Sequence, residues 1–216
     1  MAARSLVVVS AGLSQPSATR LLADRLTEST ERLLREAGVE PRVRVVELRD
    51  HAQDLANNLL TGFPAARLRS VIDAAMGADG LIAVSPIFNA SYSGLFKVFF
   101  DVLERDGLAG MPVLIAATGG SARHSLALEH AFRPLFAYLG AAVVPTAVYA
   151  ATEDWGQAAD PVAGSLTERI ARATAELARA IATGSPRTTG DPFADPVPFE
   201  ELLGGIDAGR DPRDRG

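Results

Sequence analysis

Four hydroxyl side chains lie close together just after the first apolar run of the chain. Residues 6–9 read LVVV, and Ser10, Ser14, Ser17 and Thr19 follow within the next ten positions. Apolar residues recur at helical spacing after Ser17, so these hydroxyls are expected at the amino end of a helix, where free N–H groups and the helix dipole favour an anion. A phosphate monoester can be held there without any lysine. The alternative is that Ser17 merely caps the helix, with Thr19 in its first turn.

A second segment whose residue types could bind a ligand, residues 85–94 (SPIFNASYSG), follows another apolar run. Pro86 holds the preceding residue extended and removes one N–H group from the turn, so that Ile87 and Phe88 are free to border a flat ring. Asn89 offers both a donor and an acceptor, as the edge of a heterocycle with alternating C=O and N–H groups requires. The competing interpretation is an ordinary turn in which Asn89 and the serines are caps and Phe88 belongs to the core.

The third segment is Thr118-Gly119-Gly120-Ser121, directly after the apolar run 112–117. Glycine has no Cβ, so its backbone N–H can approach a ligand closely. A plain turn is the alternative. Each segment is weak evidence alone, and their shared position after apolar runs is what makes them informative.

The apolar pattern predicts five alternations of strand and helix, which favours a doubly wound α/β parallel sheet with helices on both faces. The expected strands span 5–10, 43–48, 80–85, 112–117 and 141–149, and the expected helices span 17–38, 64–76, 95–103, 124–139 and 162–182. With the strand order 2-1-3-4-5, the three segments become neighbours at the carboxyl edge of the sheet, where ligands of such folds bind. A phosphate monoester joined to a flat heterocycle is the chemistry of flavin mononucleotide (FMN).

The composition argues against several other functions. The 216 residues carry a formal net charge of −5, which removes the attraction that nucleic acid or an anionic membrane requires. With no cysteine and three scattered histidines, neither thiol redox chemistry nor a metal site is expected, so redox chemistry needs a bound cofactor. The first segment has neither GxGxxG nor GxxxxGK, and no apolar stretch of about twenty residues occurs. We expect a cytoplasmic protein with one domain over 1–183 and a Pro-, Gly- and Asp-rich tail over 184–216.

Residues 5 to 180 resemble the NAD(P)H-dependent FMN reductase family, in particular the reductases of two-component flavin monooxygenase systems. The most characteristic match is the run from Ser85 to Lys97 (SPIFNASYSGLFK), followed by Asp101. Residues 15–19 (QPSAT) resemble the phosphate loop of the family, and residues 118–120 (TGG) its third loop. The family commonly has Gly-Ser-x-Arg where this chain has Gly-Leu-Ser-Gln at 12–15, so the ligand donors at 13–15 are open.

The resemblance implies a flavodoxin-like fold, FMN and NAD(P)H as the small molecules bound, and hydride transfer from NAD(P)H to N5 of FMN. No side-chain acid or base is required, and the N–H groups of Gly119 and Gly120 are candidates to stabilise the charge that grows on the reduced ring. Reduced FMN is expected to leave for a partner flavin-dependent monooxygenase. The residues expected to bind FMN are Ser10, Leu13, Ser14, Gln15, Ser17, Ala18, Thr19, Pro86, Ile87, Phe88, Asn89, Thr118, Gly119, Gly120 and Ser121.

Three other functions stay open at this point. In a quinone or azo-compound reductase the FMN is retained and a second substrate accepts the hydride. A flavodoxin-like electron carrier has no NAD(P)H activity of its own, but such carriers are usually smaller and more acidic. A third possibility is a protein of this fold that binds another phosphorylated ligand.

The helix expected over 95–103 is apolar on most of its sides, including Phe96, Phe99 and Phe100. One sheet face does not cover that much apolar surface, so a homodimer or homotetramer is expected. The three histidines, His51, His124 and His130, and the pair Asp154-Trp155 are expected to be structural or surface residues.

Overall fold

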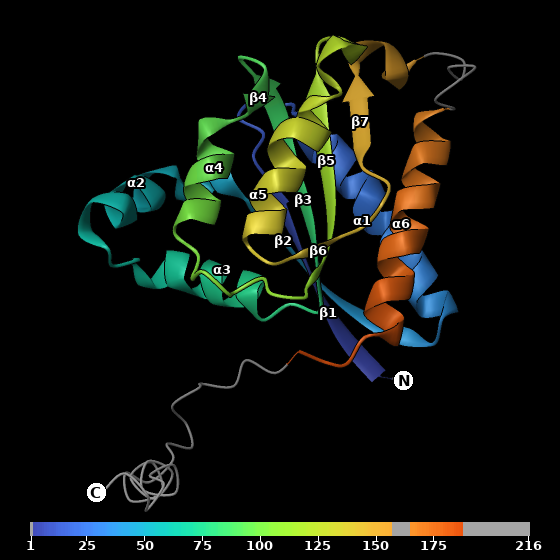
Figure 1. The fold of residues 1–216 in the computed structure, drawn as a ribbon, viewed down its shortest axis with the longest axis horizontal. Helices are drawn as coiled ribbons and strands as arrows, with labels where there is room; N and C mark the ends of the chain where they lie inside the picture. Colours follow the sequence, from blue (N-terminus) through green and yellow to red (C-terminus); the bar gives the residue numbers. More distant parts are fainter. Residues whose placement is uncertain (1, 157–164, 188–216) are drawn as a thin grey trace, which may run out of the picture.

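The computed structural model describes residues 2–156 and 165–187, which form a parallel sheet between two layers of helices (Figure 1). The sheet order is β2-β1-β3-β5, and β6 and β7 pair with successive parts of β5. The strands span Ala2–Ser10 (β1), Val39–Glu47 (β2), Gly80–Phe88 (β3), Pro112–Gly119 (β5), Ala142–Val143 (β6) and Val148–Ala151 (β7). The predicted doubly wound sheet is confirmed, and its 2-1-3-4-5 order holds because β6 and β7 together occupy the fifth position.

The fifth strand is divided, although the sequence predicts one continuous strand over 141–149. Pro145 lies in the gap and has no N–H group to donate to the sheet. The guanidinium of Arg133 donates to the carbonyl groups of Val144 and Pro145 at 3.3 and 3.1 Å. These bonds satisfy backbone acceptors that a continuous strand would have placed in the ladder.

Helices cover both faces of the sheet (Figure 1). One layer is α1 (Ala18–Glu36) and α6 (Leu166–Thr183), and the other is α3 (Ala66–Met76), α4 (Gly94–Asp101) and α5 (Arg133–Tyr138). Alternate residues of β1 face the two layers, since Leu6 and Val8 belong to the core against α1 and α6, and Val7 and Val9 to the other core. Burial on both faces explains why this strand reads as a continuous apolar run.

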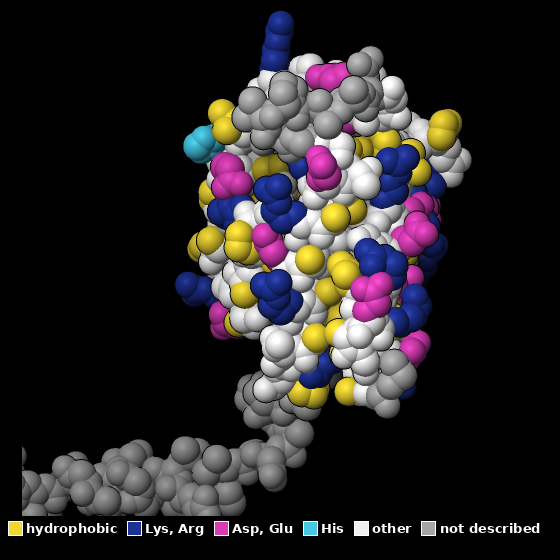
Figure 2. Space-filling model, turned by 90° about the vertical axis from the view of Figure 1, so that its right-hand side faces the viewer, with side chains coloured by type: hydrophobic (Ala, Val, Ile, Leu, Met, Phe, Trp, Pro, Cys, Tyr) yellow, Lys and Arg dark blue, Asp and Glu magenta, His cyan; other side chains and the backbone are white. Residues whose placement is uncertain are grey.

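The outer surface of the α6 layer is charged. Figure 2 shows this side, where basic and acidic side chains alternate around small apolar patches. Ser165 caps α6 and forms a reciprocal pair with Glu168, whose carboxylate accepts from the Ser165 N–H at 2.7 Å. Within the described residues, no helix combines the length and the apolar character needed to cross a bilayer.

The sequence did not predict helix α2 (Ala52–Thr61), which projects at the side of the molecule next to α3 and α4 (Figure 1). Only Leu55 and Asn58 of this helix are buried, so it lacks the apolar stripe that identifies a helix in a sequence. Its apolar residues Leu59 and Leu60 are exposed, as is Phe63 just beyond its end.

The helix predicted over 124–139 is three different pieces. A 3₁₀ turn (η2, Ala122–His124) is followed by a π-helical segment (η3, Leu128–Phe132) and then by α5. The wider turn of the π segment shifts the register, and Leu128, Phe132 and Phe136 are all buried in the core. Apolar spacing alone does not distinguish this arrangement from a regular helix.

The argument that Phe96, Phe99 and Phe100 form a subunit interface is wrong. These rings are at most 1% exposed in the single chain. Phe132 lies against Phe96 and Phe136 against Phe100, with ring centroids 5.1 and 4.8 Å apart, and Phe99 packs against Phe100 at 5.2 Å. The apolar surface of α4 that the sheet leaves uncovered is therefore filled by η3 and α5 of the same chain.

A polar cluster, which we call the amino-edge clamp, closes the opposite end of the sheet. The carboxylate of Asp79 accepts hydrogen bonds from the Ser5 N–H at 2.7 Å and the Arg187 N–H at 3.0 Å, and Arg4 lies 3.6 Å away. Burial by itself would raise the pKa of Asp79, but these hydrogen bonds and the Arg4 charge lower it overall. Arg4 also donates to the Gly184 carbonyl at 2.6 Å, which fastens residues 184–187 to the domain.

The predicted tail over 184–216 is described only in those first four residues. Residues 188–216 lie outside the described part of the chain, so the division between a domain over 1–183 and a tail stays a prediction.

Candidate mononucleotide-binding site

The three predicted segments meet at the carboxyl edge of the sheet, because β1, β3 and β5 are adjacent. The hydroxyl groups of Thr19 and Thr118 form a hydrogen bond at 2.8 Å that joins the first and third segments. The N–H of Ala11 donates to the carbonyl of Val84 at 2.9 Å and joins the first segment to β3. The first segment therefore lies in direct contact with the third segment and with the strand that leads into the second. That the three together bind a ligand stays a prediction.

Ser17 has the capping role that the sequence left open. Its Oγ accepts a hydrogen bond from the Arg20 N–H at 3.2 Å. A hydroxyl that accepts one bond still has its own proton to donate, so capping and phosphate binding are compatible. A Cβ at Gly12 would lie 2.2 Å from the Ser17 Oγ, so a larger residue there would displace the Ser17 hydroxyl from its capping position.

The other predicted residues of the first loop divide by exposure. Ser10 and Thr19 are almost completely buried, at 1% and 3% exposed. Four residues present their backbone or side chains at the surface: Leu13, Ser14, Gln15 and Ala18. Three of these exposed residues, Leu13, Ser14 and Gln15, lie in the stretch whose ligand donors the sequence left open.

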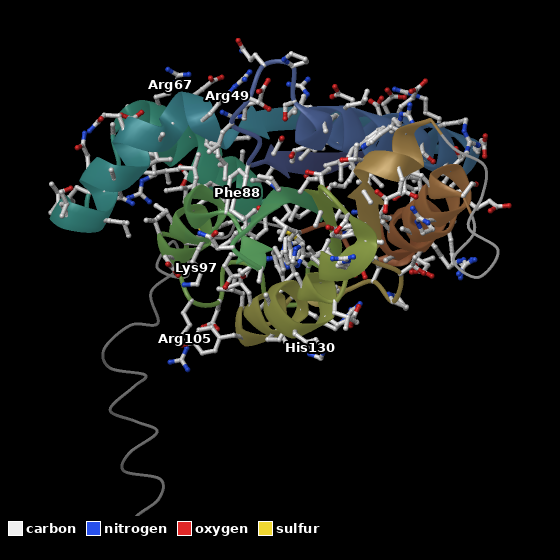
Figure 3. The ribbon with its side chains drawn as sticks, turned by 90° about the horizontal axis from the view of Figure 1, so that it is seen from above. Arg49, Arg67, Phe88, Lys97, Arg105 and His130 are labelled. Carbon is white, nitrogen blue, oxygen red and sulfur yellow. The ribbon has the colours of Figure 1, made fainter. Side chains whose placement is uncertain are left out.

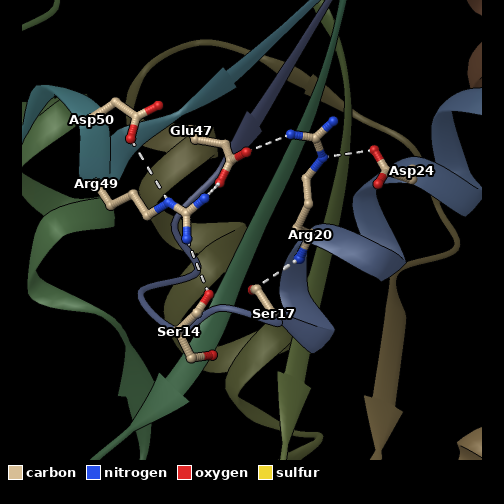
Figure 4. A network of polar contacts seen from close by, with 7 residues as sticks. All are labelled: Ser14, Ser17, Arg20, Asp24, Glu47, Arg49 and Asp50. Carbon is tan, nitrogen blue, oxygen red and sulfur yellow. Dashed lines mark hydrogen bonds and ion pairs between the residues drawn. The ribbon is translucent and has the colours of Figure 1, made fainter.

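A network of charged residues supports this loop from the side (Figure 4). Arg49 donates to the Ser14 carbonyl at 3.1 Å and pairs with Glu47 at 2.6 Å. In the amide orientation that satisfies both groups, the Gln15 oxygen accepts from Arg49 at 2.7 and 3.0 Å. Glu47 also pairs with Arg20 at 2.6 Å, and a cavity of about 280 Å³ lies beside these residues and the loop.

Arg20, Glu47 and Arg49 were not among the residues predicted from the sequence to form the site. Arg20 also donates to the carboxylate of Asp24 at 2.7 Å, and this hydrogen bond is the main reason that the pKa of Arg20 is raised. The signal that could have found Arg49 is the glutamine at position 15, where the family commonly has an arginine. Arg49 brings a guanidinium to that position from another part of the chain.

The second segment is a hairpin. β3 continues to Phe88 and pairs antiparallel with β4 (Ser91–Tyr92). The two connecting residues, Asn89 and Ala90, have φ angles of +48° and +68°, the left-handed conformation that a tight type I′ turn requires. Asparagine tolerates this conformation well, whereas alanine pays about 1 kcal/mol.

The ring of Phe88 is 47% exposed, so the alternative that it belongs to the core is wrong. Seen from above the carboxyl edge, Phe88 lies near the centre of the face (Figure 3). Pro86 and Ile87 are half-buried, and Asn89 is exposed at the turn. The Ser85 hydroxyl accepts from the Ser93 N–H at 2.9 Å and holds the base of the hairpin.

The third segment is held by Tyr149. The Tyr149 hydroxyl donates to the Ser121 carbonyl at 2.9 Å, and a Cβ on Gly119 would lie 2.0 Å from that hydroxyl. Burial raises the pKa of Tyr149, and the charges of Glu153 and Asp154 raise it further, so the phenol stays a donor. Gly119 is needed for this internal contact.

Gly120 is exposed, and a Cβ placed on it would meet no atom within 4 Å. Its backbone therefore remains accessible to a ligand.

These features fit a flavin mononucleotide. The capped start of α1 suits a phosphate, the exposed Phe88 and Asn89 suit a flat heterocycle, and Gly120 offers backbone to its edge. The sheet order and the position of the site define a flavodoxin-like mononucleotide-binding protein.

Comparisons with known proteins agree with this class. Residues 4–156 match the family described as NADPH-dependent FMN reductase. An FMN reductase (NADPH) of Pseudomonas aeruginosa is 40% identical over 152 residues, which are 69% of this chain and 78% of that protein. The NADH-dependent FMN reductase SfnF of Pseudomonas putida is 40% identical over 152 residues, or 70% and 80% of the two chains. An oxidoreductase structure from Corynebacterium diphtheriae has a TM-score of 0.81 and 46% identity, covering 86% of this chain and 100% of that chain.

The chain belongs to the NADPH-dependent FMN reductase family. It is an NAD(P)H:FMN oxidoreductase, and FMN and NAD(P)H are the small molecules that it uses.

Proposed function

We propose that this protein passes hydride from NADH or NADPH to N5 of FMN and releases the reduced FMN to a separate flavin-dependent monooxygenase. The observation that carries this proposal is the convergence of three loops on one edge, fixed by the bond between Thr19 and Thr118. Bound FMN supplies the ring that accepts the hydride. The described part of the chain offers no second domain to enclose an organic substrate, which supports release of the product.

In this proposal the residues of the chain bind and orient. Ser17 and the start of α1 would hold the phosphate, and Phe88 would border the flat ring. Asn89 and the Gly120 N–H donate to the edge of the ring where negative charge develops, and this stabilises the reduced product. No side-chain acid or base is needed.

An FMN-retaining quinone or azo-compound reductase is the alternative, followed by a flavodoxin-like electron carrier. Both need tight flavin binding, whereas release needs moderate affinity. A ligand bound at nanomolar affinity, about −12 kcal/mol, dissociates slowly at ordinary association rates.

The test is an anaerobic reaction of the purified chain with FMN and NADH or NADPH. Stopped-flow absorbance follows bleaching of the flavin, and rapid gel filtration measures whether the reduced flavin stays bound. We expect bleaching and a dissociation rate faster than steady-state NAD(P)H oxidation. Slower dissociation would contradict free transfer and favour the retaining reductase, and no bleaching would favour the electron carrier.

We further propose that the protein is cytoplasmic and a homodimer or homotetramer. The support for assembly comes from the end of α2, where Leu60 on the helix and Phe63 just beyond it are 86% and 81% exposed. Light scattering of the wild type and of the double variant Leu60→Ser, Phe63→Ser tests this. A wild type that is monomeric at micromolar concentration would contradict the proposal.

A further inference from the structure

We propose that a basic cavity next to the flavin loops binds a phosphate group of the nicotinamide dinucleotide. The cavity, which we call the Arg123 cavity, has a volume of about 310 Å³ and is lined by Ala90, Arg123, His124, Leu126, Ala127, His130 and Ala131. This inference rests on the proposed function, because it names the place where the second substrate of that reaction is held.

The position of the cavity connects it to two of the three flavin loops. Ala90 belongs to the hairpin turn that presents Asn89, and Arg123 follows Gly120 by three residues. His130 lies on η3 at the outer edge of the face that has Phe88 near its centre (Figure 3). A dinucleotide with its nicotinamide on the flavin can therefore extend over the hairpin turn to reach the cavity.

The charge of the cavity suits an anion. Its lining includes one arginine and two histidines and no acidic residue. Among the described residues, no carboxylate pairs with Arg123, whose side chain is exposed. Of the neighbouring carboxylates, Glu153 accepts from the Ala122 N–H at 3.3 Å. Glu129 pairs with Arg133 at 2.7 Å and also interacts through its charge with His130.

A local site of this kind is needed because the whole chain repels polyanions. The formal net charge is −5, yet every nicotinamide dinucleotide carries a negatively charged pyrophosphate. Arg123 offers a planar fork of donors to a phosphate, and the imidazole N–H groups of His124 and His130 add donors even when neutral. Leu126, 63% exposed, adds an apolar surface for a ribose or a base.

The experiment uses the full chain and compares Arg123→Ala and His124→Gln with Arg179→Ala. Arg179 is an exposed arginine on α6, in the opposite helix layer, and is the matched control. KM is measured for NADPH and for NADH at saturating FMN, and FMN affinity is measured by fluorescence. We expect Arg123→Ala to raise KM about tenfold or more, His124→Gln to raise it less, and all three variants to keep the wild-type FMN affinity.

Comparison of NADPH with NADH shows which phosphate group the cavity binds. A rise in KM for NADPH alone assigns the cavity to the 2′-phosphate, and an equal rise for both assigns it to the pyrophosphate. KM values for both nucleotides that match those of Arg179→Ala would overturn the inference.

A direct binding measurement separates this inference from the proposed function. Calorimetry titrates 2′,5′-ADP and ADP into the wild type and into Arg123→Ala, and it requires no catalysis. Binding by the wild type that the variant loses supports the cavity even if FMN reduction failed. Equal binding by the two proteins, or binding by neither, would overturn the proposal that the cavity binds a phosphate. FMN reduction is tested separately by its own assay.

Discussion

The cations beside the first loop and the cation beside the third loop have opposite surroundings. Arg20 and Arg49 share the carboxylate of Glu47, and Arg20 has Asp24 as a second partner. Arg123 has no carboxylate partner within the described residues. Paired guanidinium groups have little net charge left for a ligand, so their role is to hold backbone in place. An unpaired one keeps its charge available, and this difference separates supporting residues from candidate ligand-binding residues.

The largest effect is expected from Gly12→Ala, which tests whether the first loop acts through its shape. The new Cβ would lie 2.2 Å from the Ser17 Oγ and 3.1 Å from the Thr19 Cβ. Relief of such a clash costs about 1 to 3 kcal/mol, so the FMN dissociation constant should rise about tenfold to a hundredfold. Fluorescence titration measures it, with Gly156→Ala, where a Cβ meets nothing within 4 Å, as the control. Unchanged affinity would show that the loop adapts and that its shape is not decisive.

Arg49→Ala tests the paired cations directly. The variant loses the hydrogen bonds to the Ser14 carbonyl and the Gln15 amide, and the loop becomes less ordered. We expect FMN and riboflavin to bind about three- to tenfold more weakly, and by similar factors. Arg44→Ala, which removes an exposed arginine bonded to Ser70, is the control. A loss confined to FMN would contradict the comparison, because it would show that Arg49 acts on the phosphate through its charge.

The Asp79→Asn variant tests the amino-edge clamp, a cluster of paired charges at the opposite end of the sheet from the candidate site. The folded-state pKa of Asp79 lies below its unfolded value, so its ionised form stabilises the protein above the unfolded pKa. This contribution is lost as the pH falls below about 4. Urea unfolding should show a loss of about 1 to 2 kcal/mol for the variant at pH 7 and a smaller difference at pH 3. FMN affinity should not change, and a change would mean that the two edges of the sheet are coupled.

The smallest effect is expected from Ala90→Gly, in the hairpin turn of the second segment that also lines the Arg123 cavity. Glycine relieves the left-handed strain of Ala90 but adds freedom to the unfolded chain, so a net gain of about 0.5 kcal/mol is expected. Asn89→Gly is the matched variant and should gain less, because asparagine tolerates its φ of +48°. Urea unfolding measures both. A larger gain in unfolding free energy for Asn89→Gly would show that the backbone strain is at Asn89 and not at Ala90.

The sequence predicted the elements whose signal is local. β1 is buried on both faces and reads as an apolar run, and α3 shows the spacing of Leu68, Val71 and Ile72. The sequence did not predict the elements that lack a clear apolar pattern or that differ from a regular helix only in their hydrogen bonds. The exposed tip of α2 has no apolar stripe, and the π segment over 128–132 differs from an α-helix only in its hydrogen-bond register.

The same distinction applies to the site. The three loops were recognisable because each follows an apolar strand, and parallel strands end at one edge. Glu47 and Arg49 were not, because Glu47 ends β2, Arg49 follows it, and both reach the first loop only through the fold. The burial of Phe96 could not be predicted from the sequence either, because the rings that cover it belong to the distant residues Phe132 and Phe136.

The hydrogen bond between Thr19 and Thr118 makes two distant positions of the sequence interdependent. Both side chains are at most 5% exposed, so the loss of one hydroxyl leaves the other buried without its partner. Substitution of both by valine removes the pair together and should cost less than the two single changes added. Epistasis of this sign constrains how the family can vary here: a mutation at one threonine favours a compensating mutation at the other.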